Sequence, residues 1–504
     1  MKRKKNILEY LEDTVLRVPQ KTAFSNGKED MSFGELYRAS RAVGTELARL
    51  GLRGEAVAVF MDKHPNAMAA FFGTIYAGCF YVCIDSAMPE ERVRLILENV
   101  SARAIIADAK GMAKASKFET EYILRFEEIA RTEEDAGILS DVRRRQIDTD
   151  PIYVVFTSGS TGVPKGVVAC HRSVIDYTEA LCEALGFSEN TVFGNQTPLY
   201  FDAPLKEIMP TLMLGATTYF IPKMLFSFPV KLVEYLNTNK INTICWVVSA
   251  LVQVSTLGAL DVTRPEYLTT VAFGSEVFPK KDYKIWRDTL PNARFFNLYG
   301  PTEATGMSCF WRAERELCED EPIPIGEPFD NTDIILLGDG GREAAEGEEG
   351  EICIRGTCLT MGYYGNDEKT SEAFVQNPLN RAYPELIYRT GDIGRDNEYG
   401  ELVFVTRRDS QIKHMGHRIE LGEIDSSVLK CGGTARACSV YDGDKKRIVL
   451  FYVGELDPSE LQKQLAQRLP RYMLPAEAVR LDSLPLTDNG KTDRRKLKDM
   501  ACGN

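Results

Sequence analysis

A loop rich in glycine and hydroxyl residues follows an apolar run in this chain. Residues 152–156 (IYVVF) lead directly into residues 157–166 (TSGSTGVPKG). Glycine lets backbone amides approach a polyanion, hydroxyls donate hydrogen bonds to phosphoryl oxygens, and a lysine adds positive charge. The sequence therefore predicts a strand followed by a loop that binds phosphates, although a solvated turn has a similar composition.

The loop differs from a Walker A motif on both sides of its lysine. Pro164 stands before Lys165 and Gly166 stands after it, so the usual glycine and the magnesium-binding Ser or Thr are both missing. Phosphate contacts are therefore expected from the glycines, hydroxyls and lysine of this loop rather than from a Walker A arrangement. The candidates are Thr157, Ser158, Gly159, Ser160, Thr161 and Lys165.

Length and composition narrow the class of protein. A chain of 504 residues with 44% hydrophobic content is expected to form two or three domains. Its net charge of -12 argues against a nucleic-acid binder. Because no apolar run reaches the roughly 20 residues that a bilayer requires, we expect a soluble, cytoplasmic protein without a membrane partner. The 12 scattered cysteines and four histidines predict free buried thiols and no zinc site.

The order of the predicted elements indicates an α/β fold. Short β-branched runs alternate with helical patterns, which predicts a large N-terminal domain of mixed and parallel sheets with helices. Residues 32–35 (SFGE) form a capping box for a helix that ends at Gly51, and residues 6–13 begin an amphipathic surface helix. Glycine-rich turns near residues 336–356 predict a β-rich subdomain.

The chain changes character after Thr406. From Arg407 onward it holds 18 Lys and Arg against 14 Asp and Glu, so a small basic module follows an acidic body. We expect a core domain over residues 1–405, a hinge over 406–409, and a small mobile α+β domain over 410–504.

Ten phrases in this order resemble the adenylate-forming superfamily, which includes acyl-CoA synthetases, luciferases and the amino-acid adenylation domains of nonribosomal peptide synthetases. The resemblance covers nearly the whole chain, and ten ordered matches are far more specific than any one of them. The phrases are MSFGEL, YAGCFYVCID, FTSGSTGVPKGV, NQTPLYFDA, NLYGPTEA, GEICIRGTCLTMGYY, YRTGD, RRDSQIKHMGHRIELGEID, LPRYMLP and NGKTDRRK.

The chain is most similar to the stand-alone D-alanine carrier-protein ligases of this superfamily. The length and the phrases NQTPLYFD and INTICWVVSALV carry this likeness. The sequence ends shortly after NGKTDRRK, so we expect an acyl or peptidyl carrier protein that acts in trans through its phosphopantetheine arm. The implied substrates are ATP and an amino acid, with Mg²⁺ as the metal.

The resemblance implies roles for the residues that handle ATP. Lys491 would reach the substrate carboxylate and the α-phosphate, Thr302 would bind the α-phosphate, and Glu303 would bind Mg²⁺. These types suit an attack of a carboxylate on phosphorus, in which negative charge accumulates on phosphoryl oxygens. The remaining nucleotide-binding candidates are Asn297, Tyr299 for adenine, Gly300, and Asp392 and Arg407 for the ribose.

Other implied roles belong to the second half-reaction. Asp409 matches the hinge about which the small domain rotates, and Thr406 stands where the family usually has glycine. Gly416 and residues 418–423 would line the channel for the phosphopantetheine thiol. A basic C-terminal module would suit an acidic carrier, although a solvated basic face is the commoner explanation of such an excess.

Asp202 is the candidate partner of a substrate ammonium. It precedes Ala203 and Pro204, so it is also a candidate N-cap of the next helix, and both roles are compatible. Gly274 stands where the D-alanine ligases have a cysteine, which predicts a larger pocket. The implied pocket wall consists of Ala203, Lys206, Cys245, Val271, Phe273, Gly274, Leu298, Gly306 and Met307.

The substrate remains open at this point. D-Alanine or another small amino acid is the first expectation, whereas Lys206 motivates a larger polar or acidic amino acid. Lys206 could also pair with Asp202 one turn away, or point to water. An acyl-CoA or aryl-CoA ligase would share the nucleotide motifs but would not need Asp202. A silent nucleotide-binding protein is disfavoured because Glu303 and Lys491 are both present.

Overall fold

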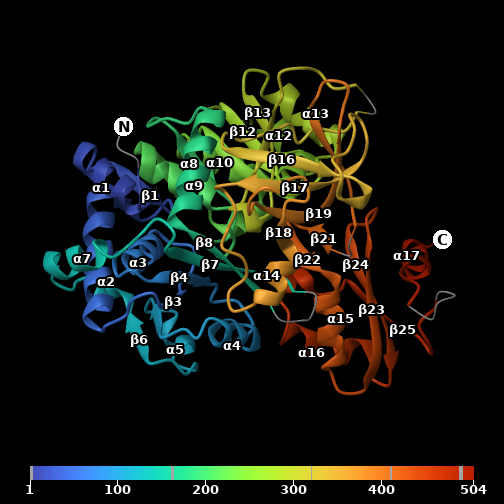
Figure 1. Ribbon diagram of the computed structural model, residues 1–504, viewed down its shortest axis with the longest axis horizontal. Helices are drawn as coiled ribbons and strands as arrows, with labels where there is room; N and C mark the ends of the chain where they lie inside the picture. Colours follow the sequence, from blue (N-terminus) through green and yellow to red (C-terminus); the bar gives the residue numbers. More distant parts are fainter. Residues whose placement is uncertain (1–3, 160–163, 319–320, 409–410, 487–491, 504) are drawn as a thin grey trace. The chain divides into compact units, whose positions relative to one another are not determined.

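The computed structural model describes residues 4–159, 164–318, 321–408, 411–486 and 492–503. The chain divides into two compact units (Figure 1). The core unit contains Met1–Ser86, Ser101–Val155 and Val167–Thr406, and the C-terminal unit contains Ala87–Val100, Phe156–Gly166 and Arg407–Asn504. The C-terminal unit therefore includes two segments from the N-terminal part of the sequence. The expected division, in which each domain is one continuous stretch, assigns both segments to the core domain.

A nine-stranded sheet forms the first layer of the core unit. Its central strands are parallel, and antiparallel strands add to both edges. In spatial order the strands are β15 (Glu327–Pro328), β14 (Cys309–Arg312), β13 (Arg294–Tyr299), β12 (Thr270–Gly274), β11 (Thr243–Val247), β9 (Val192–Asn195), β10 (Thr217–Phe220), β1 (Thr22–Ser25) and β2 (Asp30–Ser32).

A six-stranded sheet precedes most of these strands in the sequence. Its order is β6 (Tyr122–Arg125), β5 (Ala104–Ala107), β3 (Ala56–Phe60), β4 (Phe80–Ile84), β7 (Pro151–Thr157) and β8 (Lys165–Cys170). The pairs from β6 through β7 are parallel. Strand β7 is the expected strand ahead of the glycine-rich loop, and β8 follows the loop.

The β-rich section is a five-stranded sheet. Its strands are β16 (Thr332–Leu337), β17 (Gly350–Gly356), β18 (Phe374–Gln376), β19 (Leu386–Asp396) and β20 (Leu402–Arg407). Strands β16, β17, β19 and β18 pair antiparallel in that order, and β20 pairs with β19. The glycine-rich turns therefore mark a hairpin, as the sequence predicts.

Helices connect the strands of the core unit. They are α1 (Leu8–Arg17), α2 (Phe33–Arg49), α3 (Pro65–Tyr76), α5 (Met112–Ala115), α6 (Phe126–Ile129), α7 (Ala136–Arg143), α8 (His171–Leu185), α9 (Leu205–Leu214), α10 (Pro229–Thr238), α11 (Val248–Thr256), α12 (Ala259–Val262), α13 (Lys280–Thr289) and α14 (Asp367–Ala373), with 3-10 turns η1 (Lys223–Ser227), η2 (Thr302–Ala304) and η3 (Asp339–Gly341). Parallel strands joined by helices confirm the expected α/β class.

Local sequence signals explain where α2 begins and ends. The Ser32 hydroxyl accepts from the Glu35 N–H at 3.3 Å, and the Ser32 N–H donates to Glu35 Oε2 at 2.8 Å. These two bonds form the capping box that the sequence predicts. The helix ends at Arg49, and Gly51 follows with a φ of +74°, a conformation that glycine adopts without strain.

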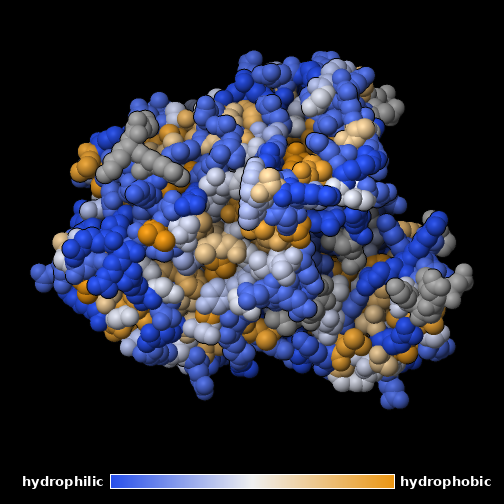
Figure 2. Space-filling model, in the orientation of Figure 1, coloured by the Kyte–Doolittle hydropathy of each residue, from blue (hydrophilic) through white to orange (hydrophobic). Residues whose placement is uncertain are grey.

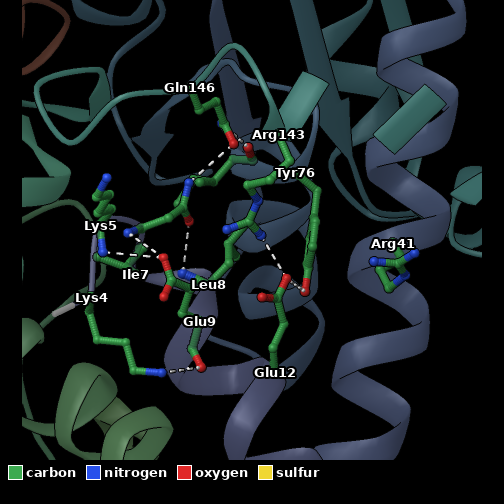
Figure 3. Close-up of polar contacts among 12 residues, drawn as sticks. Lys4, Lys5, Ile7, Leu8, Glu9, Glu12, Arg41, Tyr76, Arg143 and Gln146 are labelled. Carbon is green, nitrogen blue, oxygen red and sulfur yellow. Dashed lines mark hydrogen bonds and ion pairs between the residues drawn. The ribbon is translucent and has the colours of Figure 1, made fainter. Parts of the chain in front are cut away.

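Helix α1 is amphipathic and packs through its apolar face. Ile7, Leu8 and Leu11 are buried, and the polar side joins neighbouring helices through Glu12 (Figure 3). Glu12 Oε1 accepts from the Tyr76 hydroxyl at 3.1 Å and from Arg143 Nη2 at 2.6 Å. These two bonds therefore connect α1 to α3 and α7.

The C-terminal unit is an α+β unit. Strands β21 (Gln411–His414) and β22 (His417–Glu420) form a hairpin. A separate sheet has the order β23 (Thr434–Asp442), β24 (Arg447–Gly454) and β25 (Glu477–Arg480). Its helical elements are α4 (Glu90–Asn99), α15 (Leu421–Leu429), α16 (Pro458–Ala466), η4 (Arg471–Met473) and α17 (Arg494–Cys502).

The nine-stranded sheet has a separate apolar cluster on each face, because successive side chains of a strand point to opposite sides. Cys245, Ala272 and Leu298 belong to one cluster, whereas Trp246 and Phe273 belong to the other. All 12 cysteines are free, as expected. Among the described residues, no helix is long and apolar enough to cross a membrane. The face drawn in Figure 2 is mostly hydrophilic, with scattered apolar residues.

Candidate active site

The candidate residues of the core unit lie at the carboxyl ends of neighbouring parallel strands. Asp202 follows β9, Gly274 ends β12, and Tyr299 ends β13. Strands β9, β11, β12 and β13 are adjacent and parallel, so these ends share one edge of the sheet. Ligands of open α/β sheets bind at this edge, outside the carboxyl ends of the strands.

Residues 299–308 form a closed loop after β13. The Ser308 N–H donates to the Tyr299 carbonyl at 2.7 Å, and the Gly306 N–H donates to the Pro301 carbonyl at 3.2 Å. A Cβ on Gly300 would lie 2.5 Å from the Gly306 carbonyl oxygen, so only glycine fits there. The loop presents Thr302 and Glu303 from the short turn η2.

Glu303 is held by the segment that follows β17. Its side chain is fully buried, and the Tyr363 hydroxyl donates to Glu303 Oε1 at 2.7 Å. The Thr360 N–H and hydroxyl both donate to the Glu303 carbonyl, at 3.0 and 2.9 Å. A fixed carboxylate oxygen suits Mg²⁺, which proteins often hold with one or two carboxylates plus substrate phosphates. Among the described residues, no group of three His, Cys, Asp or Glu forms an all-protein metal cage.

Two candidate nucleotide-binding residues are joined directly. The Tyr299 hydroxyl donates to Asp392 Oδ2 at 2.6 Å, and both residues are buried. The Thr390 hydroxyl accepts from the Asp392 N–H at 3.0 Å. Burial and the Asp392 carboxylate hold the Tyr299 pKa well above its usual value, so the phenol stays protonated. Asn297, also buried, donates through Nδ2 to the Pro324 carbonyl at 2.7 Å.

Asp202 does not cap the helix that follows it. Helix α9 starts at Leu205 with Pro204 as its N-cap residue, and no side chain makes a capping hydrogen bond. A Cβ added to Gly306 would lie 3.9 Å from Asp202 Oδ2 and 3.8 Å from the Tyr177 hydroxyl, so both groups lie close to Gly306. The Asp202 charge also contributes to the raised pKa values of Tyr153 and Tyr177. The capping alternative is therefore wrong, and the carboxylate lies close enough to Tyr153 and Tyr177 to influence them electrostatically.

The structure gathers much of the expected pocket wall on one face of the sheet. Cys245, Leu298 and Met307 belong to the same apolar cluster as Tyr177 and are at most 5% exposed. Ala203 and Lys206 are also buried. Burial raises the pKa of the Cys245 thiol well above its usual value, so it stays a neutral wall residue.

Three expected wall residues do not fit their assigned roles. Phe273 points to the opposite face of the sheet, where its ring packs edge-on against Phe278 with centroids 4.9 Å apart, and Val271 shares that face. Gly274 does not enlarge the pocket, because an added Cβ would lie 2.3 Å from the Leu298 carbonyl oxygen. The resemblance to the family predicts neither result. The alternation of side chains along β12 determines the face on which Phe273 lies, and the spacing between β12 and β13 determines the room beside Gly274.

A buried charged cluster lies beside the pocket wall. Glu207 is 1% exposed, Asn195 Nδ2 donates to its Oε2 at 3.3 Å, and its Oε1 has no hydrogen bond to any described residue. Burial raises the pKa of Glu207 to about 8. Lys63 Nζ donates to the carbonyls of Asn195 and Gln196 at 3.2 and 3.0 Å, and burial lowers its pKa to about 7. The sequence feature that could have indicated this cluster is the pair Lys206-Glu207 within the otherwise apolar residues 205–214.

The C-terminal unit places the glycine-rich loop against its hairpin. The Ser158 hydroxyl donates to the Arg418 carbonyl and accepts from the Glu420 N–H, both at 3.0 Å. The Gly159 N–H donates to Glu423 Oε2 at 3.0 Å, and Lys165 Nζ lies 3.8 Å from Glu420 Oε1. The loop's candidate phosphate donors are therefore partly engaged by protein groups.

Glu423 also receives a buried arginine. Arg92 Nη1 lies 2.7 Å from Glu423 Oε1, and both side chains are buried. Gly416 has a φ of +77° after Met415 at +53°, so the β21–β22 hairpin turns through two residues of positive φ. Glycine at position 416 therefore has a local structural reason in addition to its implied role in the thiol channel.

Several candidates lie elsewhere. Ser160, Thr161, Asp409 and Lys491 fall outside the described residues. Thr157 and Arg407 belong to the C-terminal unit, whereas Thr302 belongs to the core unit.

Three residues near the site were not expected from the sequence, namely Tyr177, Tyr363 and Glu207. The phrase that ends in GYY contained Tyr363, and its position after a glycine-rich turn was the available signal.

Family models and curated relatives identify this arrangement. The model for the AMP-binding enzyme family matches residues 11–364, and the model for the AMP-binding enzyme C-terminal domain matches residues 423–491. The L-proline--[L-prolyl-carrier protein] ligase of Streptomyces coelicolor is 30% identical over 96% of each chain. Tyrocidine synthase 1 of Brevibacillus parabrevis is 30% identical over 98% of this chain, which spans only 45% of that protein.

Solved structures share the fold. The artificially fused adenylation–PCP didomain NpsA-ThdA from Klebsiella oxytoca has a TM-score of 0.83 at 21% identity, covering 95% of this chain and 94% of that one. The o-succinylbenzoate CoA synthetase of Bacillus subtilis has a TM-score of 0.83 at 20% identity, covering 98% of both chains. Together with the family matches, these results show that the chain belongs to the AMP-binding enzyme family and is an AMP-forming ligase of the adenylate-forming superfamily.

Proposed function

We propose that this protein uses ATP to convert a free amino acid into its aminoacyl adenylate and then transfers the aminoacyl group to the phosphopantetheine thiol of a separate carrier protein. In the first step the substrate carboxylate attacks the α-phosphorus and pyrophosphate leaves. In the second step the thiol attacks the aminoacyl carbonyl, a thioester forms, and AMP leaves.

The observation that carries the proposal is the free carboxylate of Asp202. It makes no capping bond and no ion pair with a described residue, and it lies beside Tyr177 and Gly306 at the ligand-binding edge of the sheet. A substrate ammonium provides the opposite charge that this carboxylate lacks. A fatty or aryl acid would offer it no partner.

Residues of the 299–308 loop support the first step. Thr302 would donate a hydrogen bond to the α-phosphate, and Glu303, fixed by Tyr363, would hold Mg²⁺. Bound Mg²⁺ would neutralise the phosphate charge that develops during the attack. The Asp392 carboxylate, oriented by its bond to Tyr299, is an acceptor of the type that suits ribose hydroxyls. Lys491 is proposed to contact the reacting carboxylate.

Support for the carrier comes from relatives and from charge. The S. coelicolor protein, which matches over almost its full length, is by name a carrier-protein ligase. From Arg407 onward the chain carries an excess of four basic residues, whereas the preceding part is strongly acidic. An acidic carrier would be attracted to such a segment, because complementary charge raises association rates.

ATP–pyrophosphate exchange tests the proposal. The panel contains both enantiomers of the common amino acids together with matched acids that lack the amino group. Exchange that requires the amino group supports the proposal, and exchange with the amine-free acids favours an acyl-CoA or aryl-CoA ligase. Transfer of a radiolabelled aminoacyl group to added holo-carrier proteins tests the second step.

A further inference from the structure

Lys63 joins the two large sheets of the core unit at the start of the segment that carries Asp202. It lies shortly after β3 of the six-stranded sheet. Its Nζ donates to the carbonyls of Asn195 and Gln196 at 3.2 and 3.0 Å. Asn195 is the last residue of β9 in the nine-stranded sheet, and Gln196 begins the connection to α9. Most lysines extend into water, so two bonds to consecutive backbone carbonyls indicate that this ammonium has a specific use.

The end of β9 is a junction at which several elements meet. The fully buried Asn195 accepts at its carbonyl from the Ile221 N–H, which follows β10, at 3.1 Å. Its Nδ2 donates to Glu207 Oε2 on α9 at 3.3 Å. Lys63 adds a bond from the other sheet, and burial lowers its pKa to about 7. Strand β9, strand β10, helix α9 and the six-stranded sheet are therefore connected through one residue.

A short loop runs from this junction to Asp202. Within the loop the Phe201 N–H donates to the Pro198 carbonyl at 3.4 Å, and the Leu205 N–H donates to the Asp202 carbonyl at 2.9 Å. Lys63 holds the loop where it begins, and α9 holds it where it ends. The Asp202 carboxylate makes no capping bond to α9, so its position depends on the backbone of this loop.

Resting on the proposed function, we propose that Lys63 is a positioning residue for the amino-acid substrate. Its two bonds hold the 196–204 loop in the conformation in which the Asp202 carboxylate pairs with the substrate ammonium. Lys63 acts through the loop backbone and does not contact the substrate. The residues that are proposed to bind ATP lie on other segments, so the loss of Lys63 should weaken the use of the amino acid and spare the use of ATP.

The test measures ATP–pyrophosphate exchange by wild-type protein and Lys63→Met. The probe is the amino acid with the highest wild-type kcat/KM among both enantiomers of the common amino acids. Lys63→Met removes bonds from a charged donor, so the KM for this amino acid should rise about 10-fold or more, whereas the KM for ATP should change less than about twofold. Lys110→Met, at an exposed position after the neighbouring strand β5, is the matched control and should leave both KM values unchanged.

A double variant with Asp202→Asn separates positioning from a general structural role. If Lys63 acts through Asp202, Lys63→Met should have little further effect on kcat/KM for the amino acid once Asp202 is replaced, because the two changes are then not additive. Additive effects, or equal rises in the KM values for the amino acid and ATP, would overturn the proposal. Lys63→Gln, which keeps an N–H donor, replaces Lys63→Met in the same cycle if the methionine variant fails to fold. Absence of exchange by wild-type protein with every amino acid would instead remove the proposed function.

Discussion

The Tyr299 hydroxyl donates to Asp392 Oδ2 at 2.6 Å, which joins two buried residues that are 93 positions apart. Tyr299 ends β13 of the nine-stranded sheet, and Asp392 belongs to β19 of the five-stranded sheet. One hydrogen bond therefore connects the loop that carries Thr302 and Glu303 to a different sheet of the core unit. It also fixes the carboxylate that is proposed to bind the ribose.

Removing this hydroxyl should affect both stability and nucleotide binding. Tyr299→Phe leaves one bond of a buried carboxylate unmade, so we expect a loss of about 1–3 kcal/mol in unfolding free energy. The KM for ATP should rise more than kcat falls, because Asp392 loses its orientation. Urea unfolding and exchange kinetics measure the two effects. Tyr399→Phe, at an exposed position, is the control, and equal behaviour of the two variants would contradict the prediction.

Asp202→Asn should strongly reduce amino-acid activation while sparing the fold. The carboxylate makes no capping bond to α9, so its replacement removes no described contact of the helix. A substrate ammonium would lose its counter-charge, and we expect kcat/KM for the amino acid to fall about 100-fold or more. ATP binding should be unchanged, as measured by nucleotide titration. Asp288→Asn on the exposed side of α13 is the control, and unchanged exchange in Asp202→Asn would favour an amine-free substrate.

Gly274 tests a point at which sequence likeness was misleading. The cysteine of the D-alanine ligases would place its Cβ 2.3 Å from the Leu298 carbonyl oxygen in this backbone. We expect Gly274→Cys to lower the unfolding free energy by roughly 1–3 kcal/mol through overpacking rather than to reshape the pocket. Gly338→Ala is the control, since its Cβ would meet only Arg342 side-chain atoms at ordinary contact distances. A Gly274→Cys protein of wild-type stability would contradict this account.

The sequence predicted the elements better than it predicted the pocket. The capping box at Ser32 and the strand before the glycine-rich loop depend on neighbouring residues, and both are confirmed. The face of the sheet on which Phe273 lies, and the lack of space beside Gly274, depend on strand pairing between distant segments. No local sequence pattern encodes that pairing. The interaction of Glu303 with Tyr363 spans 60 positions and is equally invisible in the sequence.

The raised pKa of Glu207 predicts a pH-dependent stability of definite sign. Its pKa is about 8 in the folded protein against an ordinary value of 4.5, so the folded state binds more protons than the unfolded state between these values. Stability from this group is therefore lost as pH rises from about 5 to 8. Each unit of pKa shift corresponds to about 1.4 kcal/mol.

Glu207→Gln cannot ionise and should remove this loss. Relative to wild type, we expect the variant to gain roughly 2 kcal/mol or more in unfolding free energy between pH 5 and pH 8. Lys63, with a pKa lowered to about 7, is present in both proteins. Because the Glu207 charge raises the Lys63 pKa, the difference between the two unfolding curves reports the titration of Glu207 together with its effect on Lys63. A constant difference across this pH range would show that Glu207 is not the titrating group.

Glu423 should control the protection of the glycine-rich loop in the C-terminal unit. Its two carboxylate oxygens hold Arg92 Nη1 at 2.7 Å and the Gly159 N–H at 3.0 Å. Glu423→Gln would remove the Glu423 charge from the buried guanidinium, and breaking a buried pair costs about 3–5 kcal/mol. We expect faster amide hydrogen exchange over residues 87–100 and 156–159, measured by mass spectrometry. Glu460→Gln on the exposed side of α16 should leave both segments unchanged. Because Ser158 is also bonded to Arg418 and Glu420, exchange that increases only near Arg92 would show that the hairpin holds the loop without Glu423.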